Sequence, residues 1–151
     1  MEASKTAGYS LPSRETISEA IMDILNEATT VRSQRRFHRL VLSKLQETTG
    51  PDIRLSEIRL RRIAARMDRV ELIIHCREGQ RRSGRSNCPV CSAPMENIRN
   101  STLYGWTVST GKSCPVCGYW TGHRQRIPIR YVFTIEKEKY LREKMNGKVI
   151  R

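Results

Sequence analysis

The sequence has little of what a membrane protein or a hydrolase needs. No apolar run is long enough to span a bilayer, and the start of the chain has no signal-peptide pattern. Only 3 histidines are present, far apart in the sequence, and none stands beside a nucleophile in a recognisable motif. We therefore expect a cytoplasmic protein that binds no membrane and is not an enzyme.

Acidic residues are also scarce. The 151 residues include 28 Lys and Arg against 15 Asp and Glu, which gives a net charge of +13. Residues 1–29 carry 2 basic and 5 acidic side chains, residues 30–87 carry 15 and 6, and residues 88–151 carry 11 and 4. The middle block is rich in arginine, whose planar fork suits phosphates and guanine edges, so we expect a polyanion as partner. The alternative is a basic surface that only faces solvent.

Two Cys-x-x-Cys pairs organise the second half of the chain. Cys88 and Cys91 are separated from Cys114 and Cys117 by 22 residues, a pattern that suits four thiolates around one tetrahedral ion, most naturally Zn²⁺. In a reducing compartment such pairs are more often metal ligands than disulfides. Four sulfurs leave no open position for water, so we predict a structural zinc. The alternative is two unrelated or redox-active pairs.

The turns after the two pairs differ in one residue. Gly118 follows the second pair and is free to take a positive φ, whereas Ser92 follows the first, so we expect the first turn to be the less favourable one. Residues 87–135 are too few for a self-sufficient apolar core, which explains the need for a metal.

Three segments of the first half have the apolar spacing of amphipathic helices. The spacing predicts helices over residues 14–28, 34–48 and 57–67. Ser13, Ser33 and Ser56 stand where N-caps are expected. The alternation of apolar and polar residues over 70–76 then predicts a strand with one buried face.

Arginines gather at three places in this half. Those on the third helix line up away from its apolar side, as a helix that reads a major groove requires. Those at the start of the second helix oppose its dipole, and a bound phosphate would remove that conflict. The third group lies in a basic loop that serves as wing or linker. The predicted DNA-binding residues are Arg35, Arg36 and Arg39, then Arg59, Arg62, Arg66 and Arg69, then Arg81, Arg82 and Arg85.

Alternating residues in the second half predict the strands of a ribbon. They cover residues 102–108 and 127–135, with a turn predicted at 109–112. We expect the aromatic side chains near the knuckles to shield the metal and fill a small core, with base stacking as the alternative. These are Tyr104, Trp106, Tyr119 and Trp120.

Together the patterns predict an α+β protein of four parts. A flexible leader (1–12) precedes a three-helix winged helix-turn-helix (13–86), a small antiparallel zinc ribbon (87–135) and a short C-terminal helix with a tail (136–151). A complete wing needs a second strand, and none is evident before Cys88. That strand is either missing or supplied by the C-terminal part.

A family resemblance rests on these residues. The helical pattern, the run from Ser56 to Ala65 (SEIRLRRIAA) and the Cys-Pro-x-Cys ribbon ending in Arg126 to Tyr131 (RIPIRY) resemble archaeal transcription regulators that fuse a winged helix to a rubredoxin-like zinc ribbon. The likeness covers about residues 13–135. It implies DNA binding and a structural Zn²⁺ carried by the four paired cysteines.

The leading prediction is a DNA-binding protein, a nucleoid-associated transcriptional regulator that contacts double-stranded DNA through its third helix. The second hypothesis is a zinc-ribbon adaptor in a transcription, replication or RNA-processing complex that binds RNA or protein. The third is a redox protein, because a rubredoxin-like Cys₄ site also holds iron. A protein partner in the transcription machinery and a homodimer are both compatible with the sequence.

Overall fold

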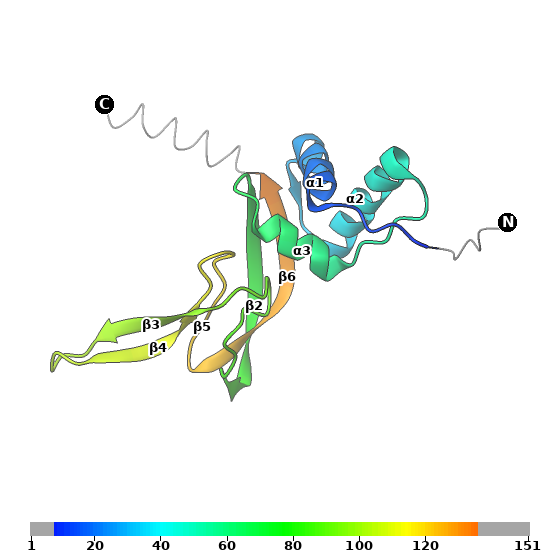
Figure 1. Ribbon diagram of the computed structural model, residues 1–151. Helices are drawn as coiled ribbons and strands as arrows, with labels where there is room; N and C mark the ends of the chain where they lie inside the picture. Colours follow the sequence, from blue (N-terminus) through cyan, green and yellow to red (C-terminus); the bar gives the residue numbers. More distant parts are fainter. Residues whose placement is uncertain (1–7, 136–151) are drawn as a thin grey trace, which may run out of the picture.

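Three helices and two small antiparallel sheets form the part of the chain that the computed structural model describes, residues 8–135 (Figure 1). The elements are α1 (Arg14–Ala28), β1 (Thr30–Val31), α2 (Gln34–Thr49), α3 (Glu57–Ala65), β2 (Val70–Arg82), β3 (Glu96–Ser101), β4 (Thr107–Ser113), β5 (Trp120–Thr121) and β6 (Arg124–Ile135). The α+β class is as predicted. The C-terminal helix predicted within 136–151 lies outside the described residues.

Each helix begins at the serine that the sequence marks as its cap. The hydroxyl oxygens of Ser13, Ser33 and Ser56 accept the backbone N–H three residues on, at 3.2, 3.3 and 3.1 Å. Such a bond satisfies one of the N–H groups that lack a partner inside the helix. Because caps depend on neighbours in sequence, α1 and α2 match their predicted bounds within one residue, and α3 ends two residues early.

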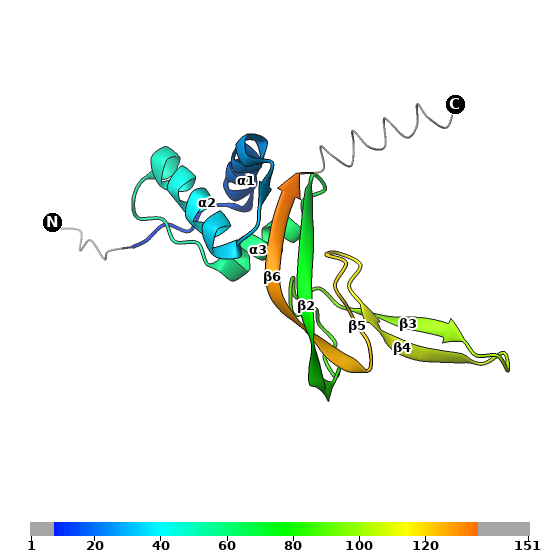
Figure 2. The same cartoon turned by 180° about the vertical axis from the view of Figure 1, so that it is seen from behind.

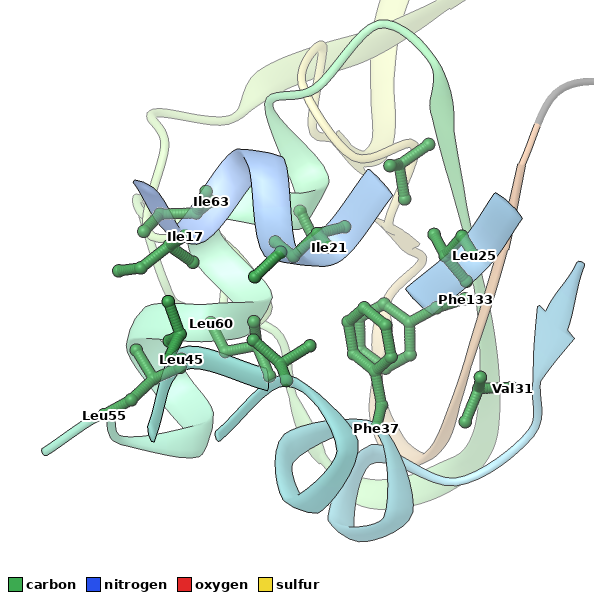
Figure 3. Packing of buried hydrophobic residues seen from close by; sticks show 14 of the residues in the cluster. Ile17, Ile21, Leu25, Val31, Phe37, Leu45, Leu55, Leu60, Ile63 and Phe133 are labelled. Atoms are coloured by element: carbon green, nitrogen blue, oxygen red, sulfur yellow. The ribbon is translucent and has the colours of Figure 1, made fainter. Parts of the chain in front are cut away.

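The apolar faces of the helices enclose one core (Figure 3). Its fully buried members on the helices are Ile17, Ile21, Leu25, Phe37, Val41, Leu45, Leu60 and Ala64. The ring of Phe133 on β6 completes it by stacking on Phe37, with ring centroids 4.2 Å apart and planes 20° apart. Figure 3 shows these two rings at the centre of the packing between the helices and the sheet.

The first sheet joins segments that are far apart in sequence. Its strand order is β1-β6-β2, and β6 pairs antiparallel with both neighbours. The β2–β6 ladder runs from Val70 opposite Ile135 to Arg82 opposite Arg124, with register shifts after His75 and after Glu78. The partner strand of β2, which the sequence leaves missing or supplied from the C-terminal part, is therefore β6.

This pairing corrects the predicted division of the chain. The sequence assigns residues 124–135 to the ribbon, but β6 lies in the sheet of the helical half. The physical reason is burial: Phe133 and Ile135 are 0% and 3% exposed within the helical core, and a ribbon of this size offers no comparable apolar cover. The ribbon proper is an insertion between β2 and β6. The two ends of this insertion meet, because the Ser83 N–H donates to the His123 carbonyl.

The inserted segment forms the second sheet, with strand order β3-β4-β5. Strands β3 and β4 make an arm that projects away from the helices (Figures 1 and 2). The turn predicted at residues 109–112 is wrong, because these residues lie inside β4. The chain reverses instead at residues 102–106, where Gly105 takes a φ of 83°.

Residues 8–12 of the predicted flexible leader are held in place. The Ser10 N–H donates to the Asp52 carbonyl at 2.7 Å, and the Ser10 carbonyl accepts the Arg54 N–H at 3.1 Å. The Arg54 guanidinium also lies 3.9 Å from the centre of the Tyr9 ring. Backbone pairing of this kind cannot be predicted from composition.

Among the described residues, no helix combines the length and the apolar character needed to cross a membrane.

Candidate metal centre and basic surface

Four cysteine sulfurs meet where the two turns of the inserted segment face each other. The Sγ atoms of Cys88, Cys91, Cys114 and Cys117 all lie within 4.8 Å of one another. The Cys88–Cys117 and Cys91–Cys114 sulfur pairs are 3.5 and 3.4 Å apart, too far for a covalent bond. A tetrahedral ion with bonds of about 2.3 Å places its ligand sulfurs roughly 3.8 Å apart. These sulfurs therefore suit one metal ion, as the spacing predicts.

The two turns have the same backbone geometry. In each, the N–H of the first cysteine donates to the carbonyl five residues on, and its own carbonyl accepts the N–H four residues on. Ser92 and Gly118 occupy the equivalent position with φ of 65° and 79°. A left-handed conformation costs a residue with a Cβ about 1 kcal/mol. The first turn is therefore the less favourable one, as expected.

Burial and hydrogen bonding set the charges of these thiols. A hydrogen bond from Cys117 lowers the pKa of Cys88 to about 5. Burial raises the pKa of Cys91 to about 11. These shifts favour the thiolate of Cys88 and oppose that of Cys91. Binding by four thiolates needs a cation, and protons compete with that cation for the sulfurs.

The metal centre and the helices share one face of the β2–β6 ladder. Val70, Leu72 and Ile74 alternate along β2 and so point to the same face. Val70 and Leu72 pack in the helical core, whereas Leu72 and Ile74 pack against the cysteine cluster, together with Cys76 and Tyr131. Cys76 therefore lies beside the four sulfurs as an apolar neighbour, as expected of a small core residue.

Arg61 connects the third helix to the first cysteine turn. Only 9% of its surface is exposed, and its Nε donates to the Val90 carbonyl at 2.8 Å. Its Nη1 donates to Gln34 Oε1 at 2.8 Å, and its guanidinium lies 4.5 Å from the centre of the Tyr131 ring. The sequence analysis missed this residue. One sequence feature could have indicated it: Arg61 does not lie on the face of the helix that Arg59, Arg62, Arg66 and Arg69 share.

We expect Arg61→Leu to destabilise the protein by about 2–4 kcal/mol, because the Val90 carbonyl and Gln34 Oε1 lose their donor. The measurement is the free energy of unfolding from urea titration of the metal-loaded protein. The matched control is Arg62→Leu, whose side chain is exposed and which should change stability by about 0.5 kcal/mol or less. Equal losses in the two variants would remove the structural role given to Arg61.

The predicted DNA-binding arginines do not all face solvent. Arg59 is half-buried, with Nη2 donating to the Pro12 carbonyl at 2.8 Å. Its Nη1 is buried and has no hydrogen-bond partner within the described residues. Arg66 is exposed, yet its Nη2 donates to the Cys91 carbonyl at 3.0 Å. The remaining ones are exposed: Arg35, Arg36, Arg39, Arg62, Arg69, Arg81, Arg82 and Arg85.

Several of these arginines are brought close to the cysteine turns. Arg62 and Arg85 line one hollow with Pro89 and Ser92 of the first turn. Arg66 lines another with Pro115 of the second turn. The start of α2 adjoins the start of α3, because Gln34 Nε2 donates to the Glu57 carboxylate at 3.0 Å and Gln34 Oε1 accepts from Arg61. The exposed arginines at the start of α2 are thus near α3.

The four aromatic side chains expected to be structural divide into two kinds. Tyr119 is 3% exposed within the cysteine cluster, and its hydroxyl donates to the Arg126 carbonyl, as a structural residue should. Trp120 is half-exposed under the Arg126 guanidinium, 3.9 Å from the ring centre. For Tyr104 and Trp106 the expectation is wrong, because the arm carries both out into solvent.

Comparison with known proteins finds no matching family model, no matching curated protein and no matching solved structure. Arguments about function therefore rest on the residues of this chain and on their geometry.

Proposed function

We propose that the protein binds double-stranded DNA as a non-enzymatic transcription regulator and contacts it through α3. The observation that carries the proposal is the placement of exposed arginines around that helix. Arg62, Arg66 and Arg69 are exposed on α3 or just after it. The starts of α2 and α3 adjoin, and Arg85 shares a hollow with Arg62. A phosphate backbone is the partner that such a set of fixed cations suits.

The topology supports this proposal. The element order is helix, strand, helix, helix, strand, strand once the inserted ribbon is set aside, and the sheet order is β1-β6-β2. We take α2 and α3 as the helix-turn-helix and the β2–β6 ladder as the wing, with the ribbon inserted at its far end. The resemblance to archaeal winged-helix regulators agrees with this assignment.

The start of α2 offers a natural phosphate contact. Arg35, Arg36 and Arg39 are exposed in its first two turns, where the helix dipole disfavours positive charge. Free N–H groups at a helix start bind anions, and arginine forks bind phosphate with two parallel hydrogen bonds. A DNA phosphate at this point would offset the local repulsion, which gives these arginines a role beside α3.

In this proposal the metal is a structural Zn²⁺. Four buried or half-buried sulfurs close the site, and soft thiolate donors select zinc or iron over harder cations. The carbonyls of Val90 and Cys91 accept from Arg61 and Arg66, so the ion would fix the position of α3 through the first turn. Purified protein that is colourless and holds one zinc would support this. A red protein holding iron would favour electron transfer.

The test is DNA binding by Arg62→Ala/Arg69→Ala, followed by fluorescence anisotropy over a range of salt concentrations. For every phosphate that the variant no longer binds, the slope of log K against log salt should fall by about 0.9. The matched control is Arg14→Ala/Lys44→Ala, which also removes two positive charges, one from α1 and one from the second half of α2. This control should bind DNA almost as tightly as the parent does. Equal weakening in both variants would contradict the role of α3. Tighter binding to structured RNA at matched salt would favour the adaptor hypothesis.

A further inference from the structure

The tip of the β3–β4 arm carries apolar side chains that residues 8–135 leave uncovered. Leu103, Tyr104 and Trp106 are 103%, 86% and 73% exposed. The arm holds them far from both cores (Figures 1 and 2). Grouped apolar side chains in contact with water are unfavourable and mark interaction sites. Neither the metal centre nor the helices use this tip.

The tip is held in a defined conformation by its own hydrogen bonds. The Thr102 N–H donates to the Trp106 carbonyl at 2.6 Å, and the Trp106 N–H donates to Thr102 Oγ1 at 3.1 Å. The Gly105 N–H donates to the Thr102 carbonyl at 3.0 Å. Across the arm, Asn100 Nδ2 donates to Thr110 Oγ1 at 2.9 Å. Because the loop is already ordered, binding of a partner to this tip costs little conformational entropy.

Charge indicates which partner the arm suits. The arm has one acidic residue, Glu96 at the start of β3, and residues 97–113 contain no further aspartate or glutamate and include Arg99 and Lys112. Lys112 lies at the base of the arm, where its Nζ donates to the Arg85 carbonyl at 3.1 Å. Arg85 in turn lines a hollow with Arg62 of α3. Arg62, Arg85 and Lys112 therefore lead from α3 to the base of the arm, and Arg99 lies nearer the tip in the β3–β4 ladder; we call these four residues the cationic strip.

The spacing of the two rings favours flat, stackable groups. The centroids of Tyr104 and Trp106 are 6.5 Å apart with planes tilted by 45°. Each ring offers a π-face on which a base can stack. Both side chains are exposed, and exposed side chains change rotamer within picoseconds to nanoseconds, so the tilt between the rings is not fixed. Exposed aromatic rings on the same element as exposed cations are the combination that binds unpaired bases.

We propose that Tyr104 and Trp106 stack on unpaired or unstacked bases of a nucleic acid whose backbone follows the cationic strip. This inference rests on the proposed function and adds to it a second contact, made by the arm rather than by α3. In a regular duplex every base is already stacked, so the arm recognises a gap, a bulge or an opened step. The arm thus gives the protein a preference for nucleic acid that is locally unpaired.

The experiment compares two probes with the full-length, metal-loaded protein: a fully paired DNA duplex, and the same duplex with a short single-stranded gap. Stacking contributes about 1–3 kcal/mol per base, so the parent should bind the gapped probe roughly tenfold more tightly or better. Tyr104→Ser/Trp106→Ser should lose this preference and keep its affinity for the paired duplex. Leu103→Ser is the control, since it removes an exposed apolar side chain from the same tip but no ring. Metal content and melting temperature confirm that each variant is folded.

Each result bears on one proposal. A parent that binds both probes equally, or a double variant that keeps the preference for the gap, overturns the role of the arm and leaves the proposed function in place. Absence of binding to either probe at low salt overturns the proposed function itself. A further measurement is binding of the parent and the double variant to vesicles of phosphatidylserine and phosphatidylcholine. The remaining result is that the parent binds these vesicles and the double variant does not, while nucleic-acid binding is the same in both. That result also overturns the role of the arm in stacking and assigns the tip to a membrane surface.

Discussion

Removing the metal with a chelator, or replacing Cys91 with serine, is expected to unfold the inserted ribbon and to weaken the helical half as well. The ribbon cluster contains few apolar residues besides its cysteines, so its folding depends on metal binding, which contributes on the order of 10 kcal/mol in small zinc domains. The carbonyls of Val90 and Cys91 also accept from Arg61 on α3 and from Arg66 at its C-cap. Loss of the first turn therefore leaves both arginines without these partners.

The measurements are metal content, circular dichroism and the melting temperature of the parent and of Cys91→Ser. The matched control is Cys76→Ser, because Cys76 packs against the same cluster from β2 but is not one of the four grouped sulfurs. We expect Cys76→Ser to keep its metal and to melt close to the parent. A Cys91→Ser protein with unchanged metal content and melting temperature would show that the four cysteines do not act as one site.

Phe133→Ala is expected to destabilise the protein by about 3–5 kcal/mol, as is usual when a buried aromatic ring is removed from a core. The ring of Phe133 is 0% exposed and stacks on Phe37 at 4.2 Å between centroids. With Ile135, it is what β6 contributes to the buried residues of a core otherwise built mostly from the first 64 residues. Because Phe133 is not among the residues that pack around the four cysteines, the folded fraction should still bind metal.

Urea titration of the metal-loaded protein measures this loss. Ile129→Ala is the control, since Ile129 lies on the same strand with its side chain exposed, and about 0.5 kcal/mol or less is expected. The two variants together test whether β6 belongs to the helical half. Similar small losses in both would return residues 124–135 to the ribbon, where the sequence pattern places them.

Features that depend on neighbouring residues were predictable from the sequence. The serine caps, the helix bounds and the two cysteine turns each involve atoms within five residues of one another. The strand over residues 127–135 was also found, because alternation reveals a buried face. Its partner was not found, since alternation says nothing about which strand lies alongside, and β2 and β6 are separated by the whole ribbon.

Residue type alone could not separate buried from exposed copies of one side chain. Arg61 and Arg62 are adjacent, yet one is buried against the first cysteine turn and the other faces solvent. Tyr104 and Tyr119 differ in the same way, because the chain reverses at residues 102–106 and carries Tyr104 outward. For Arg61 the deciding contact comes from a segment remote in sequence, the first cysteine turn, whereas for Tyr104 it is the direction in which a local turn sends the side chain.

The insertion of the ribbon between β2 and β6 has a consequence for the order of events on the ribosome. During synthesis all four cysteines leave the exit tunnel before Phe133, the ring that completes the helical core. The nascent chain therefore acquires its whole metal-binding set while its helices are still an incomplete bundle. Without the ion the insertion between β2 and β6 would stay unfolded and would act as a long loop. In cells short of the ion, β6 would then pair slowly with the first 82 residues, and chains with an incomplete core would accumulate.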